Sequence, residues 1–194
     1  MECFLNRIQL TGIRRHQAMF TPRYFKPAPP MPDGSAPPPP LLCTVVRTAR
    51  FNEADALHII WHGHYTSYFE DARMCFGKLY GITYQALEHE GLKTPIKQLH
   101  IDYIAPLLFD HDYSITTAMY WNDAARIDME YIIKDMDGGI KARGYTVQMF
   151  TTPEGNLCFA KPPFYENFCL QWSDGSLHKL AKAYVGDAFA QKIQ

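Results

Sequence analysis

Apolar and polar residues repeat with two different periods along this chain, and the change of period separates a helical part from a strand part. Residues 42–51 are rich in β-forming residues and predict a strand. From Tyr65 onward the apolar positions recur every three or four residues, which predicts one long helix that ends at Gly81. Thr83 is a suitable N-cap for a short second helix that closes at Gly91.

After the short helix the period changes to two, which is the period of strands. Alternating or β-rich segments cover residues 96–104, 113–121, 126–134 and 141–152, and residues 157–160 are a candidate for a further strand. The sequence Asp-Gly-Gly at 137–139 predicts a hairpin turn. A strand, a long helix and then consecutive antiparallel strands predict an α+β fold. In that fold a five- to six-stranded antiparallel sheet wraps around the long helix.

The two ends of the chain differ from this middle part. Residues 1–40 hold nine of the 14 prolines and predict a disordered N-terminal extension, because proline disrupts helices and central strands. Its five basic residues leave three interpretations open: a targeting or partner-binding arm, a weakly ordered leader, or translation that starts at Met19. Residues 41–160 are the predicted folded domain, and residues 161–194 predict a C-terminal helical extension.

Composition and charge narrow the classes of function. A net charge of −1 and a pI of about 6.7 give no support for nonspecific binding to nucleic acid or to a membrane surface. No apolar run approaches the roughly 18–20 residues of a membrane span, and Arg7, Arg14 and Arg15 interrupt any signal-peptide core. The five cysteines are scattered and form no Cys-x-x-Cys pair, which predicts a reducing, cytoplasmic compartment.

The segment at residues 55–65, Asp-Ala-Leu-His-Ile-Ile-Trp-His-Gly-His-Tyr, carries the candidate chemistry. It places the carboxylate of Asp55 shortly before the predicted long helix, whose first backbone N–H groups have no partner within the helix. Such N–H groups stabilise negative charge. Hydrolysis of an activated ester needs a carboxylate that attacks or deprotonates water, together with donors for the oxyanion. An Asp that only caps a turn is the structural alternative.

This segment resembles the signature of hotdog-fold thioesterases of the 4-hydroxybenzoyl-CoA thioesterase type. That signature runs Asp-x-x-Gly-Val-Val-[Tyr/Trp]-[His/Tyr]-x-x-Tyr and continues into a helix that contains Phe-Glu-x-Ala-Arg. Here Asp55, Trp61, His62 and Tyr65 keep the register, and Phe-Glu-Asp-Ala-Arg follows at residues 69–73. The resemblance covers about residues 43–152 and implies a hotdog fold and the hydrolysis of an acyl thioester.

One departure from the signature concerns His58, which stands where the family has Gly. Glycine lets a backbone turn tightly and pass close to a substrate. A histidine at this position therefore predicts either an uncommon backbone conformation or a reshaped pocket.

The resemblance also implies a role for each candidate residue. Asp55 acts as the nucleophile or general base, and the backbone N–H at His62 polarises the thioester carbonyl at the helix start. Gly63 supplies the neighbouring N–H. The substrate-binding candidates are His58, Trp61, Gly63, Tyr65 and Glu70. Core packing of Trp61 and Tyr65, and a surface ion pair between Glu70 and Arg73, are the structural alternatives.

No metal or redox cofactor is expected, and CoA or phosphopantetheine enters as part of the substrate. His58, His62 and His64 invite a metal interpretation, but the histidines downstream have no recognised ligand spacing. The expected partners are an acyl-CoA or an acyl-carrier protein and further copies of the chain in a homodimer or homotetramer. A hotdog dehydratase acting on 3-hydroxyacyl thioesters and a catalytically inactive acyl-thioester binding module are the alternative functions.

Overall fold

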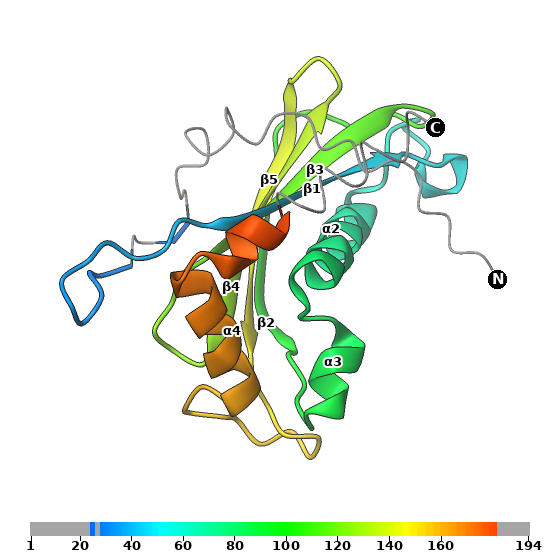
Figure 1. Cartoon of the computed structure of the whole chain (residues 1–194). Helices are drawn as coiled ribbons and strands as arrows, with labels where there is room; N and C mark the ends of the chain where they lie inside the picture. Colours follow the sequence, from blue (N-terminus) through cyan, green and yellow to red (C-terminus); the bar gives the residue numbers. More distant parts are fainter. Residues whose placement is uncertain (1–23, 26–27, 182–194) are drawn as a thin grey trace, which may run out of the picture.

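A single five-stranded antiparallel sheet forms the centre of the computed structural model, which describes residues 24–25 and 28–181 (Figure 1). The strand order is β1-β3-β4-β5-β2. The strands are β1 (Leu41–Thr48), β2 (Ile96–Tyr103), β3 (Asp112–Tyr120), β4 (Arg126–Asp135) and β5 (Ile140–Met149). The helices are α2 (Tyr65–Tyr80), α3 (Tyr84–His89) and α4 (Pro163–Ser173), and the short 3-10 helices η1 (Phe51–Glu53) and η2 (His62–His64) precede α2.

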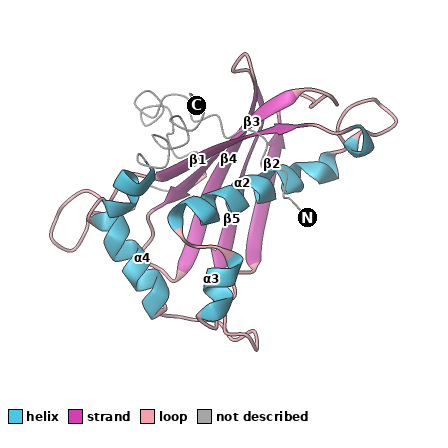
Figure 2. Cartoon of the chain, turned by 45° about the vertical axis from the view of Figure 1, so that its right-hand side comes forward, coloured by secondary structure: helices cyan, strands magenta, loops and turns pink. Residues whose placement is uncertain are grey.

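Helix α2 lies across one face of the sheet, as Figure 2 shows. Its core-facing side chains recur at helical spacing and are almost fully buried: Tyr65, Tyr68, Phe69, Ala72 and Phe76. Gly81 ends the helix in the left-handed conformation, with φ of 78°. The Thr83 hydroxyl accepts a hydrogen bond from the Ala86 N–H at 3.1 Å and begins α3. The predicted α+β architecture is therefore confirmed, and so are the end of the long helix at Gly81 and the cap of the short helix at Thr83.

The two faces of the sheet are both covered. Tyr131 of β4 faces α2 and stacks on Phe69, with 4.4 Å between the ring centroids. Asp128 and Glu130 of the same strand are buried as well, although alternation turns both to the opposite face. There the backbone N–H of Tyr24 donates to the Glu130 carboxylate at 2.9 Å. The polar residues Asp128 and Glu130 of this alternating strand are thus interior.

Helix α4 belongs to the same hydrophobic core as α2. The Tyr165 ring packs on Phe150 at 4.6 Å, and the indole N–H of Trp172 donates to the Pro39 carbonyl at 2.8 Å. Residues 176–181 are also helical. The rest of the predicted C-terminal extension, and most of the predicted N-terminal extension, lie outside the described residues.

Three strand predictions are wrong, and one of them, for residues 141–152, extends beyond Met149, where β5 ends. Residues 157–160 form no strand, because after the turn at Gly155 only one bridge, from Thr151 to Leu157, joins them to the sheet. The first strand ends at Thr48, because the Glu53 carboxylate accepts from the Arg50 N–H at 3.0 Å and the chain tightens into η1. No helix in the described part of the chain is long and apolar enough to cross a bilayer.

Candidate active site

The loop that carries Asp55 is held in place by backbone hydrogen bonds at both of its ends. The Asp55 N–H donates to the Ile59 carbonyl at 2.9 Å, and Ala54 pairs with Ile60 in an isolated β-bridge. One Asp55 carboxylate oxygen accepts from the Leu57 N–H at 2.8 Å. The side chain is partly exposed, so its second oxygen can face a substrate. Asp55 thus does form the turn bond of its structural alternative, and that bond also orients the carboxylate.

His58 occupies the turn of this loop with a φ of 60°. This left-handed region suits glycine and is uncommon for residues with a Cβ atom. The uncommon conformation that the departure from the family signature predicts is therefore present. The chain keeps the turn and places an exposed imidazole at its tip.

The 3-10 helix η2 brings two backbone donors to the beginning of α2. The Trp61 N–H donates to the Glu53 carbonyl and the His64 N–H to the Trp61 carbonyl, both at 2.9 Å. The intervening N–H groups of His62 and Gly63 have no acceptor among the described residues. These are the two groups predicted as oxyanion donors, and the dipole of α2 adds to their positive potential.

The Trp61 ring leaves no room for a side chain at Gly63. A Cβ atom at this position would lie 2.0 Å from the Trp61 ring, so any larger residue would displace the indole. The Trp61 ring lies across the turn and contacts the His62 and His64 rings at 5.0 and 5.6 Å. Within the described residues, no group of three or more His, Cys, Asp or Glu side chains is arranged to hold a metal ion.

Tyr65 differs from the other aromatic candidate because it is buried. Its hydroxyl accepts from the Leu107 N–H at 3.1 Å, and its ring contacts Tyr103 at 4.9 Å. Trp61 is 48% exposed, and the Tyr103 hydroxyl donates to the His62 carbonyl at 3.1 Å. Tyr65 therefore seats the beginning of α2, whereas Trp61 is available to a ligand.

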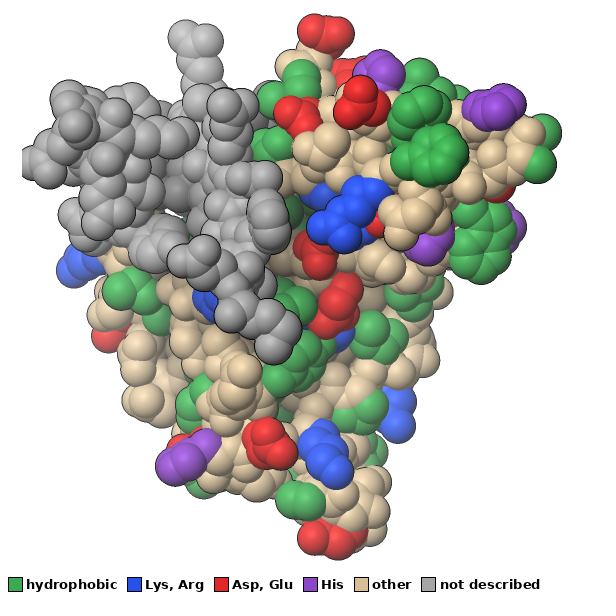
Figure 3. Space-filling view, turned by 90° about the vertical axis from the view of Figure 1, so that its right-hand side faces the viewer, with side chains coloured by type: hydrophobic (Ala, Val, Ile, Leu, Met, Phe, Trp, Pro, Cys, Tyr) green, Lys and Arg blue, Asp and Glu red, His purple; other side chains and the backbone are tan. Residues whose placement is uncertain are grey.

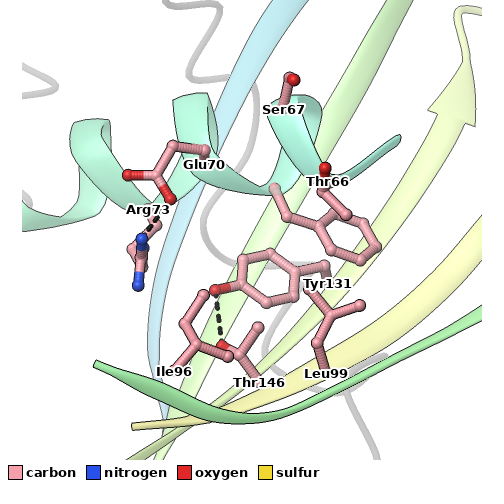
Figure 4. Close-up of a pocket in the computed structure, with 9 residues that line it drawn as sticks. Thr66, Ser67, Glu70, Arg73, Ile96, Leu99, Tyr131 and Thr146 are labelled. Carbon is pink, nitrogen blue, oxygen red and sulfur yellow. Dashed lines mark hydrogen bonds and ion pairs between the residues drawn. The ribbon is translucent and has the colours of Figure 1, made fainter. Parts of the chain in front are cut away.

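A cavity of about 280 Å³ lies between the first half of α2 and the strands β2, β4 and β5 (Figure 4). Its wall consists of Thr66, Ser67, Phe69, Glu70, Arg73, Ile96, Leu99, Tyr131 and Thr146. Burial raises the pKa of Tyr131 to about 12, so its phenol is a neutral hydrogen-bonding group, and it pairs with the Thr146 hydroxyl at 3.0 Å. The cavity thus combines apolar and aromatic walls with polar groups at its helix side.

Glu70 is the predicted site residue that lines this cavity. Its carboxylate forms an ion pair with Arg73 and accepts from the Tyr84 hydroxyl at 2.7 Å. The Arg73 guanidinium also donates to the Gln148 side-chain oxygen at 2.7 Å. The Glu70–Arg73 pair is therefore not a free surface pair. Tyr84 and Gln148 also bind it, and both of its residues line the cavity.

The structure does not bring all the predicted site residues to one place. Asp55, His58, Trp61, His62 and Gly63 lie on the loop and the helix start, and none of them lines the cavity. In Figure 3 His side chains lie mostly toward the upper end of the face, whereas hydrophobic side chains are spread over it. The cavity wall also includes Leu99 of the edge strand β2, which is 43% exposed.

Sequence reasoning missed the carboxylate of Glu53, two residues before Asp55. Glu53 is buried, forms an ion pair with Arg47, and accepts from the Tyr68 hydroxyl at 2.9 Å. Burial alone would raise the pKa of Glu53, but the Arg50 N–H, the Arg47 guanidinium and the Tyr68 hydroxyl hold it below its usual value. Arg47 also pairs with Asp71 at 2.6 Å. This network ties β1, the Asp55 loop and α2 together, and an acid before an exposed turn is too common in sequences to have signalled it.

Comparisons with known proteins agree with this architecture. The profile of the thioesterase-like superfamily matches residues 49–171. A curated protein of Aquifex aeolicus (strain VF5), named "Putative esterase", is 32% identical over 69 residues, which are 36% of this chain and 54% of that protein. The chain therefore spans about half the length of this curated relative.

Solved structures share the fold at lower sequence identity. A 1,4-dihydroxy-2-naphthoyl-CoA thioesterase from Synechocystis superposes with a TM-score of 0.59 and 17% identity, over 66% of this chain and 96% of that one. A Staphylococcus aureus protein in complex with CoA gives a TM-score of 0.62 and 16% identity, over 70% and 85% of the two chains. Because the family profile covers more than half of the sequence, this chain belongs to the thioesterase-like superfamily and has the hotdog fold that its signature implies.

Proposed function

We propose that the protein is a thioesterase that hydrolyses an acyl-CoA or acyl-carrier-protein thioester to a free acid and a thiol. One observation carries the proposal: the loop of Asp55 leads directly into two backbone N–H groups, of His62 and Gly63, that have no acceptor in the described part of the chain. A carboxylate and a pair of open donors are the two parts that thioester hydrolysis requires.

Asp55 supplies the carboxylate in this mechanism. Either it attacks the thioester carbonyl directly, or it takes a proton from the attacking water. In both cases negative charge develops on the carbonyl oxygen, and the N–H groups of His62 and Gly63 stabilise it with the help of the α2 dipole. The thiol then leaves, and water completes the hydrolysis. The chemistry needs no metal or redox cofactor.

We propose CoA as the first thiol carrier to test. The name of the Synechocystis relative specifies a CoA thioester, and the Staphylococcus aureus relative holds CoA. A carrier protein presents the same phosphopantetheine arm, so both carriers belong in the assay. Cys43, Cys75, Cys158 and Cys169 are free thiols, which fits the cytoplasmic location that we propose.

A second copy of the chain completes the site in our proposal. Within one protomer no residue of the Asp55 loop lines the cavity, and the cavity wall includes Ile96 and Leu99 of the edge strand β2. An edge strand with exposed apolar side chains is a template for pairing with another chain. Two copies that pair along β2 would cover the cavity mouth, which supports a homodimer or a dimer of dimers.

Substitution of Asp55 tests the mechanism. We expect Asp55→Asn to reduce kcat/KM for a panel of acyl-CoA substrates by about 100-fold or more, with folding and oligomer size unchanged. The matched control is Asp137→Asn, which removes the same charge in the exposed β4–β5 turn. Thiol release and free acid are both measured, because loss of water without thiol release would identify a dehydratase. Wild-type activity in Asp55→Asn would contradict the mechanism.

The same assay separates the His62 backbone from its ring. His62→Pro removes the N–H, and proline is well tolerated in the first turn of a helix. His62→Ala removes only the imidazole. We expect the proline variant to lose at least tenfold more activity than the alanine variant, in line with the loss of one oxyanion donor. Equal losses would assign the role to the ring instead.

A further inference from the structure

A second cavity follows the first along α2. It has a volume of about 180 Å³, and it lies between the second half of α2, helix α3 and the strands β4 and β5. Apolar side chains form much of its wall, among them Phe76, Ile82, Leu87, Ile127 and Met129. These residues are buried, and such a surface suits a hydrocarbon chain rather than a polar ligand.

The residues that line the two cavities follow the same spatial order along three elements, α2, β4 and β5. Along α2, Glu70 lines the first cavity, Gly77 the second, and Arg73 both. Along β4, Tyr131 lines the first and Met129 the second. Neighbouring residues of β5 repeat this order, with Thr146 before Gln148. The cavities therefore lie end to end between the helix and the sheet, and they meet at the level of Arg73.

Arg73 forms a partition between them. Its guanidinium reaches from α2 to the Gln148 side chain on β5 at 2.7 Å, and it is paired on its own helix with Glu70. Tyr84 of α3 donates to Glu70 at 2.7 Å and places its ring 5.3 Å from the guanidinium carbon. The Arg73 side chain is 12% exposed. A planar guanidinium with partners on two sides is held rigidly across the passage.

An alkyl chain cannot cross this partition without breaking its bonds. Moving the guanidinium aside would separate it from both Glu70 and Gln148, and a nearly buried charge without partners is strongly unfavourable. The first cavity therefore ends at a polar, closed wall, although an apolar space of suitable chemistry lies directly behind it.

We propose that Arg73 determines the length of the acyl group that the protein accepts. With Arg73 in place the acyl group is confined to the first cavity, so compact or short acyl groups bind. Removal of the guanidinium joins the two cavities and admits longer chains. This inference rests on the proposed thioesterase function, because it takes the first cavity as the place of the acyl group.

The test compares chain lengths rather than absolute rates. Wild type, Arg73→Ala and Arg73→Met are assayed with butyryl-, octanoyl- and dodecanoyl-CoA; the methionine keeps an aliphatic side chain in case the alanine variant fails to fold. Each methylene that enters an apolar cavity is worth about fourfold in binding. We expect the ratio of kcat/KM for octanoyl- over butyryl-CoA to rise by on the order of 10- to 100-fold.

Met74→Ala is the matched control, because it enlarges the second cavity and leaves the partition closed. The octanoyl-to-butyryl ratio of this variant should stay within about twofold of wild type. An unchanged ratio in folded Arg73→Ala or Arg73→Met, or an equal rise in Met74→Ala, would overturn the proposal.

A binding experiment distinguishes failure of the proposed thioesterase function from failure of the Arg73 proposal. If the wild-type protein released no thiol from any CoA ester, the same panel would be measured as dissociation constants. The proposal then predicts the same shift toward octanoyl-CoA in the Arg73 variants. Loss of turnover alone would thus contradict the proposed function, and a flat binding profile would contradict the partition.

Discussion

His58 is the residue at which the chain departs from its family signature, and its φ of 60° shows the cost of that departure. A left-handed conformation is unfavourable by roughly 1–2 kcal/mol for a residue with a Cβ atom, whereas glycine adopts it freely. His58 nevertheless keeps this conformation in the Asp55 turn, where its N–H donates to the Asp55 carbonyl at 3.0 Å. Strain at a position beside a candidate catalytic residue is consistent with a functional demand on the imidazole.

Replacing this histidine by glycine should therefore stabilise the protein. We expect His58→Gly to raise the free energy of unfolding by up to about 1 kcal/mol, since relief of the backbone strain exceeds the extra entropy of glycine in the unfolded chain. Denaturant-induced unfolding measures it. Ala56→Gly is the control, because Ala56 lies in the same loop without a positive φ, and it should not stabilise. Equal destabilisation by both substitutions would show that the backbone of His58 is not strained.

Glu53 makes the stability of the Asp55 loop depend on pH. Its folded pKa lies below its usual value, so its ion pair and hydrogen bonds stabilise the fold fully above that usual value. This contribution is lost as the pH falls through the lowered folded pKa. We expect Glu53→Gln to be less stable than wild type at pH 7, and this difference to shrink across the acidic range, as the pH falls through the usual pKa of a glutamate and then through the lowered folded pKa. Urea unfolding across that range measures it, and a difference of constant size would contradict the assignment.

At the scale of elements, the sequence predicted what depends on local periodicity and capping. The spacing from Tyr65 gave α2, Gly81 and Thr83 marked the following boundaries, and the Asp-Gly-Gly turn joined β4 to β5. Each of these signals acts within a few residues along the chain. The strands ending at Thr48 and Met149 were overextended, because the bonds that end them involve Glu53 and a single bridge at Thr151.

In the candidate site, too, the sequence predicted the features that depend on nearby residues and not those that depend on distant contacts. The signature placed Asp55, His62 and Gly63 on one loop and helix start, which is a local arrangement. The cavity could not be predicted, because Arg73 meets Gln148 across 75 positions of sequence. Glu70 was predicted to pair with Arg73, but the Tyr84 and Gln148 contacts that turn this pair into a cavity wall depend on how α2, α3 and β5 pack together.

At the scale of the whole molecule, the main feature is the edge of the sheet formed by β2, which has no partner strand on its outer side within one copy. Strand β2 pairs only with β5 among the described residues. Most of its residues are exposed, including Leu99 at 43% and Tyr103 at 52%. An exposed edge strand that carries apolar side chains promotes association unless another chain covers it. The same edge forms one wall of the cavity, so in the proposed dimer assembly and the site would depend on the same residues.

A charge on this edge should therefore remove assembly and activity together. We expect Leu99→Glu to convert the proposed dimer into monomers, because its interface would bury an unpaired carboxylate. We also expect it to lower kcat/KM by about tenfold or more through the opened cavity. Size-exclusion chromatography with light scattering gives the mass, and circular dichroism verifies the fold. Leu170→Glu is the control, since Leu170 is 66% exposed on α4, away from β2. A Leu99→Glu protein with the mass of wild type would show that the copies associate through another surface.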